Sequence, residues 1–228
     1  MQMQDVAKMA QADSSNDWSQ TVTRVVTKEE QKELIAYADE RGIKIPDLRS
    51  FDGDPELLRC IIDALSNIKN MLPIGRKVTL SVSHLLHDDD FGETVGDHIT
   101  LNTKALRDRV ITEQNIATAG IFASHKLEDI VVHEYGHSLA TIKCSKGLEI
   151  ARRAKYNITG TDTSLDEIIR YLRKGISAYS ITFPSKNNTP RHFDVRKYRE
   201  VIPEVLAKHN CTPDDFTSEF VRLLKELL

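Results

Sequence analysis

The sequence predicts an α+β fold in which a small mixed or antiparallel sheet is followed by a helical C-terminal half. Three observations predict it. Capping residues and apolar residues at three- and four-residue steps mark several helices, two short segments alternate as strands do, and two histidines lie one helical turn apart in an apolar segment. At 228 residues the chain can form one sizeable domain, which we place at 27–228 behind a flexible leader at 1–26.

Two helices are expected before the sheet. Thr27 and Glu30 form a capping box, in which each side chain accepts a hydrogen bond from a backbone N–H at the helix start. This helix should end near Gly42, because glycine is favoured just past a helix end. The second helix should begin at Pro55, since proline suits the first helical turn. Its apolar residues recur at helical spacing until Pro73.

Two strands should follow. Residues 77–83 and 98–102 alternate between apolar and polar side chains, which is typical of strands with one buried face. Gly96 and Asp97 precede the second segment and suit a two-residue hairpin turn. The middle of the chain therefore predicts a small, antiparallel sheet. We expect 99–102 to be its edge strand.

The C-terminal half is expected to be helical. Ser124 can cap a helix that carries the two histidines, and Ser164 with Glu167 forms a second capping box whose helix should close at Gly175. Turn residues then predict an irregular loop, and a threonine–proline–aspartate start predicts the last helix. The segments concerned are a loop at 184–190 and helices around 199–209 and 213–228.

Composition excludes several classes of function. The net charge of −3 and pI near 6.2 lack the basic excess of a nucleic-acid binder. No apolar run approaches the roughly 18 residues that a membrane span needs, and the first residues have no apolar core like that of a secretory signal. The three cysteines are widely spaced and predict neither a disulfide framework nor a thiolate metal site. We expect a cytoplasmic protein.

The strongest chemical signal is the segment from His133 to His137, which reads His-Glu-Tyr-Gly-His. Residues four apart share one helix face, so the two imidazoles can bind one cation, and zinc accepts such neutral nitrogen ligands. Glu134 would lie beside the metal, where it could take a proton from a water made acidic by zinc. An ordinary amphipathic helix is the alternative, but the preceding residues are apolar, and buried histidines need partners. Gly136 weakens a helix, which indicates close packing there.

A catalytic zinc site needs a third protein ligand, and the sequence leaves four acids open. The metzincin class is excluded, because it needs a glycine at 140 and a histidine at 143, where this chain has alanine and lysine. Glu167 already belongs to a capping box, and Asp162 lies in a segment that only faintly resembles an aspartate-ligand site. Glu200 and Glu204 lie at helical spacing, so one could bind zinc while the other orients a histidine.

Several segments together resemble a known family. They are 37–43, 51–54, 96–102, the His133 segment and 176–179 ahead of Glu200. Across most of 27–228 they resemble the glutamate-ligand zincins, or gluzincins, typified by the catalytic domain of anthrax lethal factor. The closer resemblance is to the metallopeptidase domains of phage minor head, or head-morphogenesis, proteins. Of these segments, only the one at His133 is individually specific.

The resemblance implies a role for each of three further residues. Glu200 would be the third zinc ligand, Glu204 would hold a histidine from behind, and Tyr179 would stabilise the oxyanion. Two departures stand out: the stretch from Tyr179 to Glu200 is longer than the pattern has it, and Pro203 replaces an alanine between the glutamates. Proline there requires the helix to begin near Glu200, because inside a helix it removes a hydrogen bond.

The expected function is therefore zinc-dependent hydrolysis of peptide bonds in a protein or peptide substrate. The resemblance implies that this endopeptidase is phage-encoded, lies in the host-cell cytoplasm or is associated with a virion, and has phage structural proteins as candidate partners. Two other roles stay open. The chain could be a virion or head-assembly component whose zinc site is structural or vestigial, or a toxin-like effector peptidase with the same chemistry. An intact Glu134 favours the enzymes, since a structural site needs no base.

Overall fold

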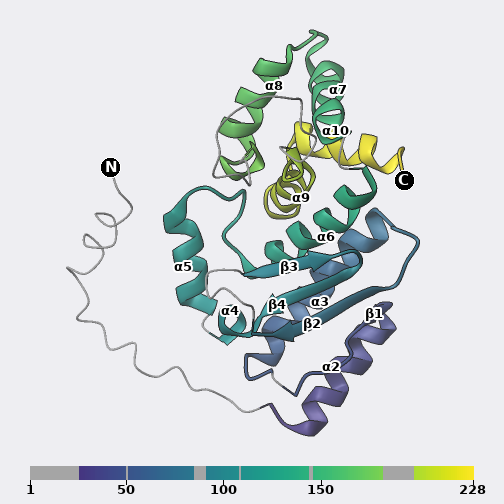
Figure 1. Ribbon diagram of the computed structural model, residues 1–228, viewed down its shortest axis with the longest axis vertical. Helices are drawn as coiled ribbons and strands as arrows, with labels where there is room; N and C mark the ends of the chain where they lie inside the picture. The colour runs from purple at the N-terminus through teal and green to yellow at the C-terminus, as the bar shows by residue number, and fades with distance from the viewer. Residues whose placement is uncertain (1–25, 50, 85–90, 108, 144–145, 182–197) are drawn as a thin grey trace, which may run out of the picture.

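The computed structural model describes residues 26–49, 51–84, 91–107, 109–143, 146–181 and 198–228. They form an α+β fold in which a four-stranded mixed sheet lies beside long helices, and further helices extend the molecule at one end (Figure 1). Nearly all of the predicted leader and the whole predicted loop at 184–190 lie outside the described residues. Most of the long segment between Tyr179 and Glu200 lies outside them as well.

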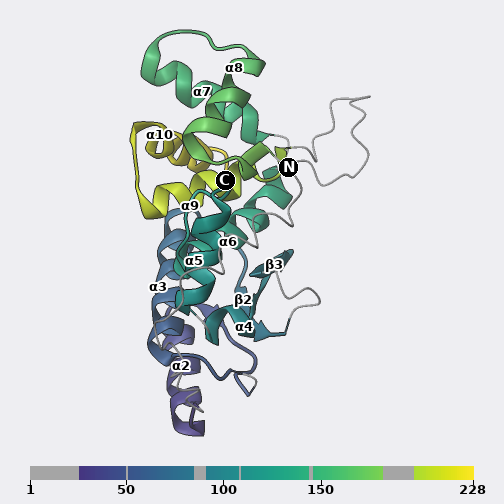
Figure 2. The same cartoon turned by 90° about the vertical axis from the view of Figure 1, so that its left-hand side faces the viewer.

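The two N-terminal helices begin where their capping residues predict. Helix α2 (Lys28–Glu40) starts at the Thr27 capping box, and α3 (Pro55–Met71) starts after Asp54, whose side chain accepts from the Glu56 N–H at 2.9 Å. The apolar stripe of α3 is buried, and Figure 2 shows this helix on one side of the molecule with the strands on the other. The stripe packs chiefly against α6 and α2, so its burial stabilises the position of the helix that carries the two histidines.

The sheet corrects two expectations. Strands β1 and β2 pair in parallel, β2 and β4 also pair in parallel, and only β3 and β4 are antiparallel. The order is β1-β2-β4-β3, so β4 is an interior strand and β3 is the edge. The edge-strand prediction for 99–102 was therefore wrong. The hairpin turn at Gly96 was right (φ +67°): it joins β3 to β4, and β4 lies between β2 and β3 in the sheet. The bounds are β1 Ile43–Lys44, β2 Val78–Ser83, β3 Gly92–Val95 and β4 His98–Asn102.

The helices after the sheet were partly predicted. The histidine helix is α6, and the capping box at Ser164 begins α8, which passes into a π-helical turn that includes Gly175. Three helices were not predicted, namely α4, α5 and α7. The bounds are α4 Thr103–Arg107, α5 Arg109–Ala119, α6 Leu127–Lys143, α7 Gly147–Thr159, α8 Leu165–Tyr171, the π-helix Leu172–Ile176, the 3-10 helix Tyr179–Ile181, α9 Val201–Cys211 and α10 Asp215–Lys225.

Helix α6 is held from both sides. The buried Tyr135 hydroxyl donates to Leu72 O at the end of α3, at 2.5 Å. On the opposite side Gly136 faces α9, where a Cβ at position 136 would lie 2.5 Å from Pro203 Cα and 2.9 Å from Pro203 N. The glycine is thus needed for close approach of the two helices, as the sequence predicted. Pro203 is the third residue of α9, where its missing N–H costs no helical hydrogen bond.

The first prediction concerns this contact. Gly136→Ala should lower the free energy of unfolding by about 1–3 kcal/mol, because overpacking α6 against α9 outweighs the gain of about 1 kcal/mol in helix propensity. Urea titration followed by circular dichroism measures it. Gly175→Ala is the matched control, since its added Cβ would meet Tyr171 at 3.6 Å, an ordinary contact. Equal stability of the Gly136→Ala variant and wild type would contradict the prediction.

Candidate metal centre

The first two candidate ligands lie on one face of α6, in the middle of this helix, and contacts with a neighbouring helix anchor its N-terminal end. That end is fixed by α5: the Leu127 N–H donates to Glu113 Oε1 at 3.2 Å, and Arg109 bonds Glu113 at 3.1 Å and Glu128 at 2.7 Å. Ser124 does not cap the helix as expected. It lies three residues before the first helical residue, where its hydroxyl donates to Asp129.

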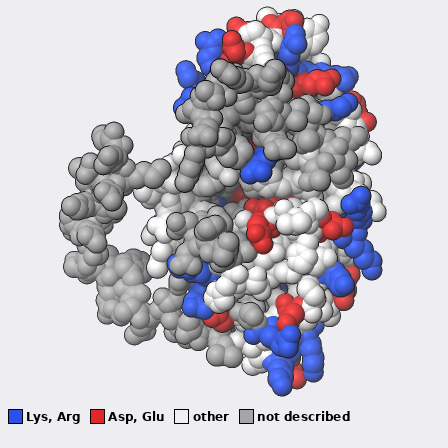
Figure 3. Space-filling model, viewed as in Figure 1, with Lys and Arg blue, Asp and Glu red and all other residues white. Residues whose placement is uncertain are grey.

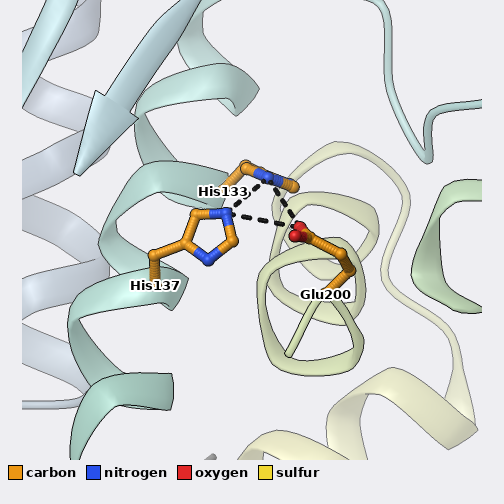
Figure 4. Close-up of side chains that lie close together, drawn as sticks. All are labelled: His133, His137 and Glu200. Carbon is orange, nitrogen blue, oxygen red and sulfur yellow. Dashed lines mark hydrogen bonds and ion pairs between the residues drawn. The ribbon is translucent and has the colours of Figure 1, made fainter. Parts of the chain in front are cut away.

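The third candidate ligand comes from α9. Glu200 is the residue before the first turn of that helix, and its carboxylate points at both histidines (Figure 4). Its Oε2 lies 3.5 Å from His133 Nε2 and 3.3 Å from His137 Nε2, while the two Nε2 atoms are 3.1 Å apart. Two nitrogen atoms from α6 and one oxygen atom from a residue more than sixty positions later in the sequence therefore form one small triangle, and this group could hold a metal ion.

The triangle has the dimensions that a small tetrahedral ion requires. With bonds of about 2.0–2.1 Å, the ligand atoms of tetrahedral zinc lie about 3.3–3.4 Å apart, which is close to all three separations. Glu200 Oε2 is also buried without a hydrogen-bond donor among the described residues. A buried carboxylate oxygen left in this way is costly unless a cation is its partner. The residues present therefore fit a metal ion.

Glu204 holds one of the histidines from behind. Its Oε1 lies 2.8 Å from His133 Nδ1, and its Oε2 accepts from the Ala123 N–H at 2.8 Å. A carboxylate on Nδ1 fixes the ring and leaves Nε2 facing the metal position. Because both of its oxygens are engaged away from His137, Glu204 is not a third member of the triangle. Of the two acids left open at helical spacing, Glu200 is the one placed to bind.

The cluster strongly shifts the pKa of two of its members, His133 and Glu200. Burial lowers the pKa of His133, but the carboxylates of Glu200 and Glu204 outweigh it and raise that pKa to about 10. Burial raises the pKa of Glu200, yet the imidazoles of His133 and His137 hold it well below its usual range. The other carboxylate oxygen is also engaged, since Arg199 Nε donates to Glu200 Oε1 at 3.0 Å. In the metal-free protein, His133 therefore carries the cation that a metal would replace.

Glu134 lies beside the triangle, in the wall of a pocket. Its carboxylate is buried, and Oε2 accepts from the Thr94 hydroxyl of β3 at 2.7 Å. The pocket has a volume of about 130 Å³ and apolar walls from the strand, from α5 and from the loop before α6. Its lining includes Phe91, Gly92, Ile116, Phe122, Ile130 and Tyr179. A concave site lined by apolar side chains together with polar ones, His133 and Glu134 among them, is the arrangement expected for binding a small group of a substrate.

Tyr179 reaches the same pocket from the 3-10 helix after α8. Its ring centroid lies 6.0 Å from that of His133 and 4.9 Å from that of Phe122, and its N–H donates to Ile121 O at 2.9 Å. Burial, followed by the charges of Glu200 and Glu204, raises its pKa to about 12, so the phenol keeps its proton at neutral pH. A protonated phenol is a hydrogen-bond donor.

The other acids weighed from sequence lie outside the centre. Asp162 is exposed and forms a bidentate ion pair with Arg152, at 2.7 and 2.9 Å. Glu167 accepts from the Ser164 N–H and hydroxyl in its capping box, at 2.9 and 2.7 Å. Both carboxylates have structural partners, as the capping pattern had indicated for Glu167.

Four contributors were not found from sequence: Gly92, Thr94, Ala123 and Arg199. Only Arg199 had a usable signal, as a basic residue directly before a candidate ligand. The others act through a main-chain N–H, through the absence of a side chain or through a hydroxyl brought near by strand pairing. None of these roles produces a recognisable pattern in a single sequence.

Cys60 and Cys211 are partly buried free thiols.

Comparison of the chain with protein-family models, with curated proteins and with solved structures found no match. The resemblance to gluzincins thus rests on the segments named from the sequence.

No helix in the described part of the chain is long and apolar enough to cross a membrane. On the face shown in Figure 3, Lys and Arg side chains lie interspersed with Asp and Glu over the part that is described.

The second prediction separates the two glutamates of α9. Glu200→Gln should abolish stoichiometric zinc binding, because it removes a charged ligand atom. Glu204→Gln should weaken zinc only about 10- to 100-fold, as the loss of an orienting carboxylate does. Competition titration against a chromogenic chelator measures both affinities. Asp162→Asn is the control and should bind like wild type; a larger loss in Glu204→Gln than in Glu200→Gln would reverse the assignment.

The third prediction concerns the release of a proton when zinc binds. Zinc needs a neutral imidazole, so binding at pH 7 should release about one proton from His133, whose pKa is raised to about 10. Calorimetry in buffers of different ionisation enthalpy measures this release. In the metal-free protein the raised pKa of His133 also adds to the free energy of unfolding. This contribution is fully present below about pH 6.5 and should be lost as the pH rises toward 10. A binding heat that does not depend on the buffer at pH 7 would contradict the prediction.

Proposed function

We propose that this chain is a zinc-dependent endopeptidase with a gluzincin-like site, in which His133, His137 and Glu200 hold the metal. The observation that carries the proposal is the position of Glu200, whose Oε2 lies within 3.5 Å of both Nε2 atoms although it comes from a different helix. A pair of histidines four residues apart can occur by chance. Helix periodicity does not, however, explain why a buried carboxylate from another part of the chain lies beside both of them. Zinc suits this donor set of two nitrogens and one oxygen.

In the proposed reaction, each residue around the triangle has a separate role. Bound zinc would polarise a peptide carbonyl and lower the pKa of water. Glu134 is the general base: its carboxylate accepts the proton of the attacking water and passes it to the leaving amine. Tyr179, kept protonated by burial, donates a hydrogen bond to the oxygen on which negative charge develops. His133 is kept in place throughout by Glu204.

The substrate we propose is an extended peptide. Strand β3 pairs with β4 along one side only, so in the described part of the chain its other side is an open edge. A peptide can add to such an edge through main-chain hydrogen bonds. Because β3 also bears the residues that contact Glu134, a peptide on this edge would run past the base. The adjacent apolar pocket suits an apolar side chain of the substrate.

The fourth prediction tests the activity. Zinc-loaded wild type should cleave dye-labelled casein, an unfolded protein, and Glu134→Gln should slow the cleavage by about 10²- to 10⁴-fold, the range that a general base supplies. The variant should still bind one zinc, because Glu134 is not in the triangle. Glu149→Gln, on the exposed face of α7, is the matched control. Undiminished cleavage by Glu134→Gln would exclude this mechanism.

A structural zinc site in a virion or head-assembly protein is the second candidate. It is favoured by the burial of Glu200 and by the way the triangle joins α6 to α9, as a metal cross-link would. The same experiment separates the two roles. Chelation that unfolds the chain, together with no cleavage by the zinc-loaded protein, would support the structural role; a folded, inactive apoprotein that zinc reactivates would support the peptidase.

A further inference from the structure

We infer that Thr94, on edge strand β3, is a positioning residue that holds the Glu134 carboxylate in place. The inference rests on the proposed function, since it assigns a task within the same site. Thr94 Oγ1 lies 2.7 Å from Glu134 Oε2 and 3.0 Å from Glu134 O. One hydroxyl thus contacts both the side chain and the main chain of the same residue, across forty positions of sequence.

The contact depends on which face of β3 the residue occupies. Gly92 and Thr94 lie two apart on one face of the strand, opposite Leu101 and Ile99 of β4, whose side chains are buried. Glu93 and Val95 lie on the other face and are exposed. Because alternate residues of a strand share one face, positions 92 and 94 both face α6.

The two positions restrict the carboxylate in different ways. Thr94 engages Oε2 by a hydrogen bond. Gly92 leaves room, because a Cβ there would lie 3.0 Å from Glu134 Cγ and 3.2 Å from Oε1. Among the described residues no donor engages Oε1, so this is the oxygen left for the proton that the base takes up. Gly92 and Glu134 both line the pocket, so the carboxylate lies beside the space that we propose for the substrate.

A positioning device is needed at Glu134. A glutamate side chain has three rotatable bonds, and fixing it costs up to about 1.5–2 kcal/mol of rotamer freedom. A general base acts only when its oxygen lies within hydrogen-bond reach of the proton. The threonine hydroxyl has one proton and two lone pairs. It donates to Oε2 before proton uptake, and because the proton goes to Oε1, Oε2 remains an acceptor to which the same hydroxyl can still donate afterwards.

The fifth prediction compares Thr94→Val with Thr94→Ser in the zinc-loaded full chain. Valine keeps the shape and the strand preference but removes the hydroxyl, so kcat on dye-labelled casein should fall about 10- to 100-fold, below the full contribution of a general base. KM and zinc affinity should stay within about twofold. Serine keeps the hydroxyl and should restore kcat to within about threefold of wild type. Gly92→Ala should lower kcat in the same way, by displacing Glu134.

Thr100→Val is the matched control. Thr100 lies on the neighbouring strand but on the opposite face from Ile99 and Leu101, so its variant should have wild-type kcat. Crystal structures of the metal-free variants give a readout that does not depend on activity. Glu134 should leave its position in Thr94→Val and keep it in Thr94→Ser.

The inference is overturned by an unchanged kcat in Thr94→Val, by a loss that accompanies loss of zinc, by failure of serine to rescue, or by an unmoved Glu134 in the crystal structure. A wild type that binds zinc but cleaves nothing would instead defeat the proposed function. In that case the crystal structures alone decide whether Thr94 holds Glu134.

Discussion

The close packing of α6 against α9 is the constraint on which the rest of the structure depends. Gly136 lets the backbone at Pro203 approach, and this contact places Glu200 and Glu204 on opposite nitrogens of His133. The cluster then contains carboxylates and imidazoles that would be costly to bury singly. Each charge is tolerated because an opposite charge lies within hydrogen-bond or ion-pair distance, so packing and electrostatics stabilise the same geometry.

Much of the fold could be read from local signals. The capping boxes at Thr27 and Ser164 and the N-cap at Asp54 begin helices where predicted, because a cap is a contact between residues close in sequence. The sheet order could not be predicted, since alternation reveals a strand but not its neighbour. Strand β3, only four residues long, was missed, and β4 was taken for the edge. Helix α5 was missed because its apolar residues are partly exposed, as Val110 and Ile111 show.

The candidate centre shows the same division. His133 and His137 could be paired from sequence because their spacing of four is itself the geometry of the site. Glu200 could be named only through a resemblance, and residue chemistry alone left it among four acids. Tyr179 had no signal of its own beyond that resemblance. Thr94 had none at all, since its contact with Glu134 arises from the register of β3 with β4 and from the packing of that hairpin on α6.

The loop from Ile121 to Ser124 shows a further property of the site. Its carbonyl at Ile121 accepts from the Tyr179 N–H, and its N–H at Ala123 donates to Glu204. Both bonds are made by main-chain groups of the loop. They therefore do not depend on the side chains at 121 and 123, but they do depend on the number of residues in the loop. Substitutions there would be tolerated, whereas a single insertion or deletion would shift the phenol and the carboxylate at once. The length of this loop is therefore more tightly constrained than its composition.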